Sequence, residues 1–110
     1  MKGIIYIRVS SDEQVKGTSL EFQDENCRKY CQEKGIEVLE VFREEGESAK
    51  DLSMHNRKEF LRALEFCRKN KGEVQVFVVL RVDRFARNTD DHFAVRKILM
   101  DYGVTLHSVT

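Results

Sequence analysis

The sequence predicts an α/β fold in which a mostly parallel sheet of about four to five strands is flanked by helices. Two observations support this prediction. Short segments of strand character alternate with helical patterns along the whole chain, and no proline interrupts them. No Pro-rich linker, low-complexity stretch or change of composition divides the 110 residues, so we expect one domain over residues 1–110.

Four segments have strand character. Residues 3–7 and 36–42 are rich in strand-favouring residues, and the second alternates as a half-covered strand does. Residues 74–80 end in a continuous apolar run, which is typical of a central strand covered on both faces. Residues 104–110 form a weaker fourth strand pattern.

Three helical patterns lie between these segments. The first covers about residues 19–34, the second follows Asn56, and the third follows Asn88 or Thr89. Glycines directly follow the first and third patterns, at the position where helices often end. The expected buried positions are Leu20, Cys27, Tyr30 and Cys31 in the first, Phe60, Leu61, Leu64 and Cys67 in the second, and Ala94, Val95, Ile98, Leu99 and Tyr102 in the third.

Composition excludes several classes of protein. The content of 41% apolar and 35% charged residues is typical of a globular domain. The longest apolar run, residues 76–80, is too short to span a bilayer, and Arg8 interrupts the apolar N-terminus before a signal peptide is complete. Three cysteines without a processing signal predict reduced thiols in the cytoplasm.

The net charge is zero but unevenly distributed. Residues 1–55 carry 8 basic and 12 acidic side chains, whereas residues 56–110 carry 11 basic and 7 acidic ones. A protein that coats DNA is usually much more basic. If this chain handles nucleic acid, we expect a local site, or a part of the protein outside this sequence, to do so.

Polar residues gather where the predicted strands end. Residues 8–12 follow the first strand, residues 44–48 the second and residues 81–91 the third. Because ligands bind beyond the carboxyl ends of parallel strands, we expect these segments to converge on one edge of the sheet.

Arginines in these segments suit a phosphate. Arg84 and Arg87 are one helical turn apart, and with Arg8 they would form a pocket of planar, permanently charged donors. Asp83 would hold one arginine in place. The alternative is a solvated charged loop whose ion pairs contribute little.

Ser10 is the candidate nucleophile at this edge. In an extended segment it shares a face with Arg8. A serine needs activation, but His55, His92 and His107 fall away from the edge, so a Ser-His-Asp triad is not expected. Arginine electrostatics or the phosphate itself would be the activator.

The sequence predicts neither a metal site nor a nucleotide cofactor. Cys27 and Cys31 are four residues apart on a helix, but Cys67 is distant and no fourth ligand is evident, so we interpret all three as core residues. No GxGxxG or GxxxxGK[ST] pattern is present.

Four motifs together resemble one family. Residues 6–11 (YIRVSS) resemble the YxRVS signature of the serine site-specific recombinases, the resolvase/invertase family, and residues 80–88 (LRVDRFARN) resemble its second signature. Residues 19–23 match its SLxxQ. Residues 42–48, followed by Arg57, resemble its FxDEGxSG segment with a following arginine.

The motifs depart from the family pattern in places. Glu44 stands where aspartate is more common, and Glu47 and Ala49 vary the EGxSG segment. The long loop between Ser10 and Ser19 resembles the large serine recombinases and transposon-encoded members more than the short resolvases.

The resemblance implies a resolvase-like catalytic domain and a mechanism. Ser10 would attack a DNA phosphodiester to give a 5′-phosphoserine and a free 3′-hydroxyl, and Arg8, Arg84 and Arg87 would stabilise the transition state. The covalent link conserves the energy of the bond, so rejoining needs no nucleotide cofactor. The resemblance assigns positioning of the nucleophile, arginines or phosphate to Gln23, Asp83, Glu44, Ser48 and Arg57.

The resemblance also implies partners. The expected partners are DNA and, in a full-length recombinase, further copies in a homodimer or homotetramer, through a long helix and a DNA-binding domain that lie outside this sequence; no membrane partner is expected. Two alternatives remain: a flavodoxin-like signalling module, and an inactive recombinase-like interaction domain. The first would have paired acids where Arg8 and Ser10 stand, and the second would not need Ser10 and three arginines.

Overall fold

The computed structural model describes residues 1–10, 20–46, 58–81 and 89–110 of the chain. The four strands form one sheet in the order β2-β1-β3-β4, and every neighbouring pair is parallel. The predicted α/β class is therefore confirmed. The elements in chain order are β1 (Lys2–Ser10), α1 (Leu20–Lys34), β2 (Glu37–Gly46), α2 (Lys58–Lys69), β3 (Val76–Val79), α4 (Thr89–Asp101) and β4 (Thr105–Ser108).

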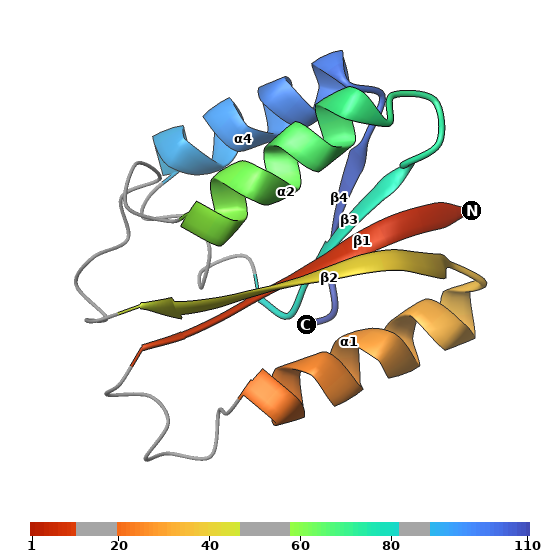
Figure 1. The fold of residues 1–110 in the computed structure, drawn as a ribbon, viewed down its shortest axis with the longest axis vertical. Helices are drawn as coiled ribbons and strands as arrows, with labels where there is room; N and C mark the ends of the chain where they lie inside the picture. The colour runs from red at the N-terminus through yellow and green to blue at the C-terminus, as the bar shows by residue number, and fades with distance from the viewer. Residues whose placement is uncertain (11–19, 47–57, 82–88) are drawn as a thin grey trace.

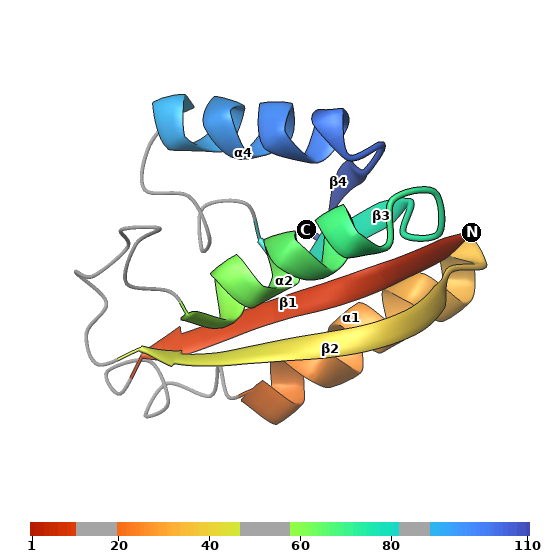
Figure 2. The same ribbon diagram turned by 45° about the horizontal axis from the view of Figure 1, so that its top comes forward.

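The sheet lies between two helical layers (Figures 1 and 2). Helix α1 covers one face, and helices α2 and α4 cover the other. Successive residues of the central strand β1 alternate between the two cores, as the strand period requires. Ile4 and Tyr6 pack toward α2 and α4, whereas Ile5 and Ile7 pack toward α1.

Glycines end two of the helices, as predicted. Gly35 after α1 and Gly103 after α4 have φ of 71° and 74°, a left-handed conformation that glycine adopts without steric cost. In each case the N–H of the next residue returns to a carbonyl of the last turn, from Ile36 to Cys31 at 2.8 Å and from Val104 to Leu99 at 2.8 Å.

Two predicted core positions were wrong. Leu61 is 45% exposed, and Ala63 is buried in α2 together with Phe60. The helical period places the buried face of α2 at the positions three, four and seven residues after Phe60. Leu61 lies outside this face. Ala94 is exposed because its neighbour Val95 occupies the face of α4 that meets the sheet.

Strands β1 and β2 extend beyond their apolar cores. The prediction ended them at residues 7 and 42, but they continue in register from Arg8 opposite Glu44 to Ser10 opposite Gly46. These residues were expected in loops and instead form paired strand. β3 and β4 are shorter than predicted.

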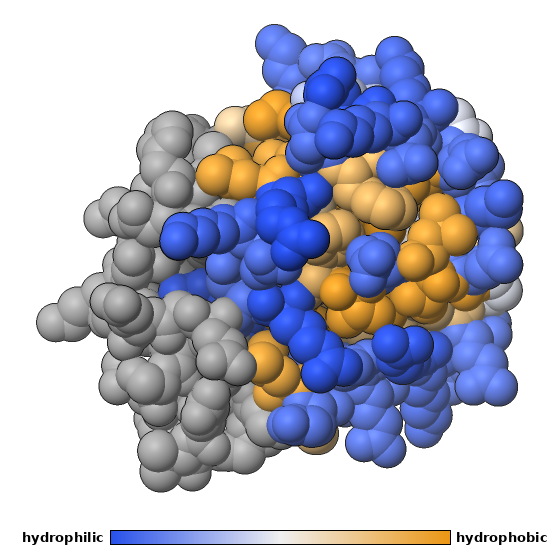
Figure 3. Space-filling view, viewed as in Figure 1, coloured by the Kyte–Doolittle hydropathy of each residue, from blue (hydrophilic) through white to orange (hydrophobic). Residues whose placement is uncertain are grey.

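Strand β2 forms one edge of the sheet, and its apolar side chains other than Phe42 are only partly covered. Apolar surface gathers across the middle of this side of the molecule (Figure 3). The pairing with β1 shifts register between Gly3 and Ile4, and Glu40 accepts a hydrogen bond from the N–H of Val41 at 3.3 Å. Irregular pairing and an acidic side chain both protect an edge from unwanted strand pairing.

Candidate active site

The carboxyl ends of β1 and β2 form the edge at which the sequence places its candidate site. The two strands run parallel to each other and end at this edge, at Ser10 and Gly46. Strand β3 points the same way but ends earlier, at Val79 opposite Tyr6. The last residues of β1 therefore extend past β3.

Arg8 is buried near this end of β1, with 5% of its surface exposed. The strand period places it on the face of Ile4 and Tyr6, toward α2 and α4. Its register partner on β2 is Glu44, so a carboxylate and a guanidinium share this face.

Gln23 of α1 holds the backbone of Arg8 from the other face. The N–H of Arg8 donates to Gln23 Oε1 at 3.3 Å, and Gln23 Nε2 donates to the carbonyl of Arg8 at 2.8 Å. Gln23 is 4% exposed. One side-chain amide thus pairs with both the N–H and the carbonyl of Arg8, which lies beyond the end of the pairing between β1 and β3. These two hydrogen bonds attach α1 to the end of β1.

Glu44 lies inside β2, not beyond it, and is buried. Its Oε1 accepts hydrogen bonds from the hydroxyl of Tyr6 at 3.1 Å and the N–H of Phe60 at 3.2 Å. Its Oε2 accepts from the N–H of Glu59 at 3.1 Å. The carboxylate therefore caps the start of α2, where unpaired N–H groups favour a negative charge. This arrangement favours a positioning role over direct phosphate contact.

Sequence reasoning missed an ionic cluster beside Gln23. Asp24, the next residue of α1, accepts hydrogen bonds from Arg28 Nε at 2.6 Å and from Arg43 Nη2 of β2. Asp24 is 8% exposed. The spacing of Asp24 and Arg28 by four residues was visible in the sequence, but the contact with Arg43 depends on how α1 packs against β2.

The side chains of the other predicted site residues are not described. Ser10 is the last residue of β1, and its position in the strand is known from its backbone. The remaining ones, Ser48, Arg57, Asp83, Arg84 and Arg87, lie outside the described residues.

The cysteines are core residues, as interpreted from the sequence. Cys27, Cys31 and Cys67 are all free and buried. Burial raises the pKa of Cys27 and Cys67 to about 12, and also raises that of Cys31. Within the described part of the chain, no three His, Cys, Asp or Glu side chains gather as metal ligands would. Of the three histidines, His107 bonds through Nδ1 to the hydroxyl of Tyr30 at 3.0 Å.

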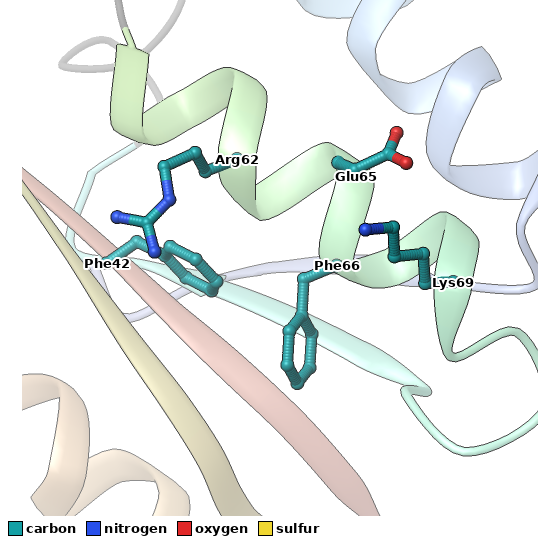
Figure 4. A pocket seen from close by; sticks show the side chains of 5 residues that line it. All are labelled: Phe42, Arg62, Glu65, Phe66 and Lys69. Atoms are coloured by element: carbon teal, nitrogen blue, oxygen red, sulfur yellow. The ribbon is translucent and has the colours of Figure 1, made fainter.

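A hollow of about 270 Å³ lies between β2 and α2 (Figure 4). Arg62 lies over the ring of Phe42, with its guanidinium carbon 6.0 Å from the centroid, and Phe66 meets the same ring edge-on. Glu65 and Lys69 complete its lining. Of the predicted site residues with described side chains, Arg8, Gln23 and Glu44, none lines it.

No helix in the described ranges is both long enough and apolar enough to cross a membrane.

One family model matches nearly the whole chain. The family described as "Resolvase, N terminal domain" matches residues 3–110. A resolvase family site-specific recombinase from Streptococcus pneumoniae is 33% identical, with a TM-score of 0.82 over 99% of this chain and 72% of that one.

Two further solved structures share the fold. The catalytic domain of ISC1926 TnpA, an IS607-like serine recombinase, has a TM-score of 0.80 at 24% identity over 99% of this chain and 70% of that one. The catalytic domain of TP901-1 integrase has a TM-score of 0.80 at 22% identity, over 99% and 77%. An uncharacterized immunity region protein 3 of Bacillus phage phi105 is 39% identical over 62 residues, which is 56% of this chain and 76% of that protein.

Proposed function

The chain belongs to the resolvase N-terminal-domain family, and from that membership we propose that it cuts and rejoins DNA through a phosphoserine on Ser10. One observation carries the proposal. Two residues before Ser10, Arg8 is buried, and Gln23 holds both of its backbone groups at the carboxyl edge of a parallel sheet. Phosphoryl transfer requires a positively charged donor held near the nucleophile, and a buried arginine with a fixed backbone two residues before Ser10 supports such a role for Arg8.

The proposed reaction is a transesterification. Ser10 Oγ forms a bond to the phosphorus, and the bond from phosphorus to the 3′ oxygen breaks. The serine loses its proton and the 3′ oxygen gains one, which leaves a 5′-phosphoserine and a free 3′-hydroxyl. Rejoining is the reverse reaction with a 3′-hydroxyl as nucleophile, so the energy of the bond is retained and no nucleotide is consumed.

The arginines would supply the electrostatic stabilisation. Charge builds up on the non-bridging oxygens of the phosphate during transfer, and guanidinium groups donate paired hydrogen bonds to such oxygens. We assign this role to Arg8, Arg84 and Arg87. Replacing Arg84 is expected to lower the rate on the order of a hundredfold, as loss of a preorganised donor does.

The remaining residues would position these groups. Gln23 acts on the backbone of Arg8, and Glu44 acts through Tyr6 and the start of α2. The proposal also assigns positioning or phosphate contacts to Asp83, Ser48 and Arg57.

The proposed setting is a recombinase acting on DNA in the cytoplasm. Residues 1–110 would be its catalytic domain, and a helix and a DNA-binding domain beyond this sequence would hold two or four copies on the DNA. The solved relatives extend beyond the match, since the chain covers 70% to 77% of the three described above.

The experiment traps the covalent intermediate. In a chimaera, residues 1–110 replace the catalytic domain of a serine recombinase with a known recombination site, and a nicked suicide substrate prevents rejoining. Adjacent residues of an extended strand point to opposite faces, so only one of Ser10 and Ser11 is expected to form the adduct.

The expected result is a DNA adduct that peptide mapping places on Ser10. The Ser10→Ala chimaera should bind its site without forming an adduct, and the matched Ser11→Ala control should still form it. An adduct on any other residue would overturn the assignment. A chimaera that binds its site and never cleaves would favour the inactive interaction domain.

A further inference from the structure

An ion pair between α1 and β2 lies next to the residues that hold β1. Asp24 follows Gln23 on α1, and Arg43 precedes Glu44 on β2. Asp24 Oδ2 accepts a hydrogen bond from Arg43 Nη2. Its other oxygen, Oδ1, accepts from Arg28 Nε at 2.6 Å within the same helix.

This ion pair differs from the others in the described residues. The pairs Glu59–Arg62 and Glu65–Arg68 join residues three apart on α2, and none of these side chains is buried. The Asp24–Arg43 pair joins a helix to a strand, and the side chain of Asp24 is only 11% exposed. A carboxylate so largely removed from water depends on charged donors, because losing one leaves its charge poorly compensated.

The ion pair also fixes the helix that carries Gln23. Gln23 binds the backbone of β1, and Asp24 binds a side chain of β2, so two consecutive residues attach α1 to both strands. The hydrogen bonds of Gln23 weaken steeply with distance and angle. A small shift of the start of α1 is therefore enough to release the backbone of Arg8.

We propose that Asp24 and Arg43 are positioning residues of the recombinase reaction. Their ion pair holds Gln23 against Arg8 and thereby fixes the end of β1 that carries Ser10. The expected effect of the ion pair on catalysis rests on the proposed function. The expected effect on the backbone of Arg8 does not.

The chain offers a matched pair of variants. Arg28→Gln and Arg43→Gln each remove one arginine from the same carboxylate, and the two side chains are similarly exposed, at 54% and 48%. Only the Arg43 contact joins two elements. Both substitutions lie at half-exposed positions, and Asp24→Asn is a third variant that weakens both contacts.

The first measurement is hydrogen exchange of backbone amides in the 110-residue chain. In Arg43→Gln, the amide of Arg8 is expected to exchange on the order of tenfold faster, while the amides of Ile5 and Val78 keep their rates. In Arg28→Gln, all three should keep their rates. Equal acceleration of all three amides in Arg43→Gln, or none at Arg8, would overturn the proposal.

The second measurement uses the chimaera. Arg43→Gln is expected to lower the rate of adduct formation at saturating DNA about tenfold, with DNA affinity unchanged, and Arg43→Lys should restore part of the rate. An unchanged rate with weaker, less salt-dependent binding would instead make Arg43 a phosphate contact and refute the positioning role. If the unsubstituted chimaera forms no adduct, the proposed function fails, while the exchange result still decides whether the ion pair positions Arg8.

Discussion

Removing the carboxylate of Glu44 should strongly destabilise the fold. Glu44 is 7% exposed and accepts three hydrogen bonds, one from the hydroxyl of Tyr6 and two from the first N–H groups of α2. In Glu44→Ala, all three donors lose this acceptor. Because Tyr6 is 2% exposed, water reaches its hydroxyl poorly.

The magnitude follows from these contacts. Loss of a helix cap costs about 1 kcal/mol. A buried hydroxyl that loses its acceptor adds about 1–3 kcal/mol. Urea unfolding of the 110-residue chain should therefore show a loss of roughly 2–4 kcal/mol in the free energy of unfolding. Glu44→Gln keeps one acceptor oxygen and should cost less.

The matched control is Glu40→Gln on the same strand. Glu40 is exposed and accepts a hydrogen bond from the N–H of Val41, and its replacement should change stability by about 0.5 kcal/mol or less. In a double-mutant cycle, Tyr6→Phe should cost less in the Glu44→Ala background than alone. If Glu44→Ala costs no more than Glu40→Gln, and the chimaera loses DNA affinity instead, the capping role is refuted.

Three further outcomes are expected. Gly3→Ala should destabilise the chain by about 1–3 kcal/mol in urea unfolding, because a Cβ there would lie 2.7 Å from the carbonyl oxygen of Val76; unchanged stability would contradict this. Cys27 and Cys67, whose pKa burial raises to about 12, stay protonated at pH 8, so a thiolate-directed reagent should label them only after unfolding; rapid labelling of the folded chain would refute it. The chimaera should cleave DNA in EDTA, and an activity that EDTA abolishes and magnesium restores would disprove the metal-independent mechanism.

Most of the fold was predictable from local patterns. The alternation of strand and helix segments, the apolar run before Leu80 and the two terminal glycines are properties of neighbouring residues, and each indicates an element directly. The ends of β1 and β2 were not predictable in this way. Hydrophobic periodicity reports burial, whereas Arg8 and Glu44 are polar residues that continue their strands in register opposite each other.

The contacts of the described site residues were not predictable from the sequence. Arg8 and Gln23 were identified by motif, and their hydrogen bonds explain why a glutamine suits that position, since an amide both donates and accepts. The contacts of Glu44 with Tyr6 and with α2 join segments 38 and 16 residues apart. Motif spacing carries no information about such distant partners.

The register of β1 against β2 decides which side chain reaches which helix. If the pairing of Gly3 with Val38 continued without a shift, Arg43 would lie opposite Arg8. The extra residue in β2 places Glu44 there instead. Two like charges directly opposite each other would be unfavourable. A one-residue slip would also exchange the faces of the two β2 residues, because the side-chain period of a strand is two. Glu44 would then face α1 instead of capping α2, and Arg43 would turn away from Asp24. The irregularity near the start of the strands therefore determines how the end of β1 is held from both faces of the sheet.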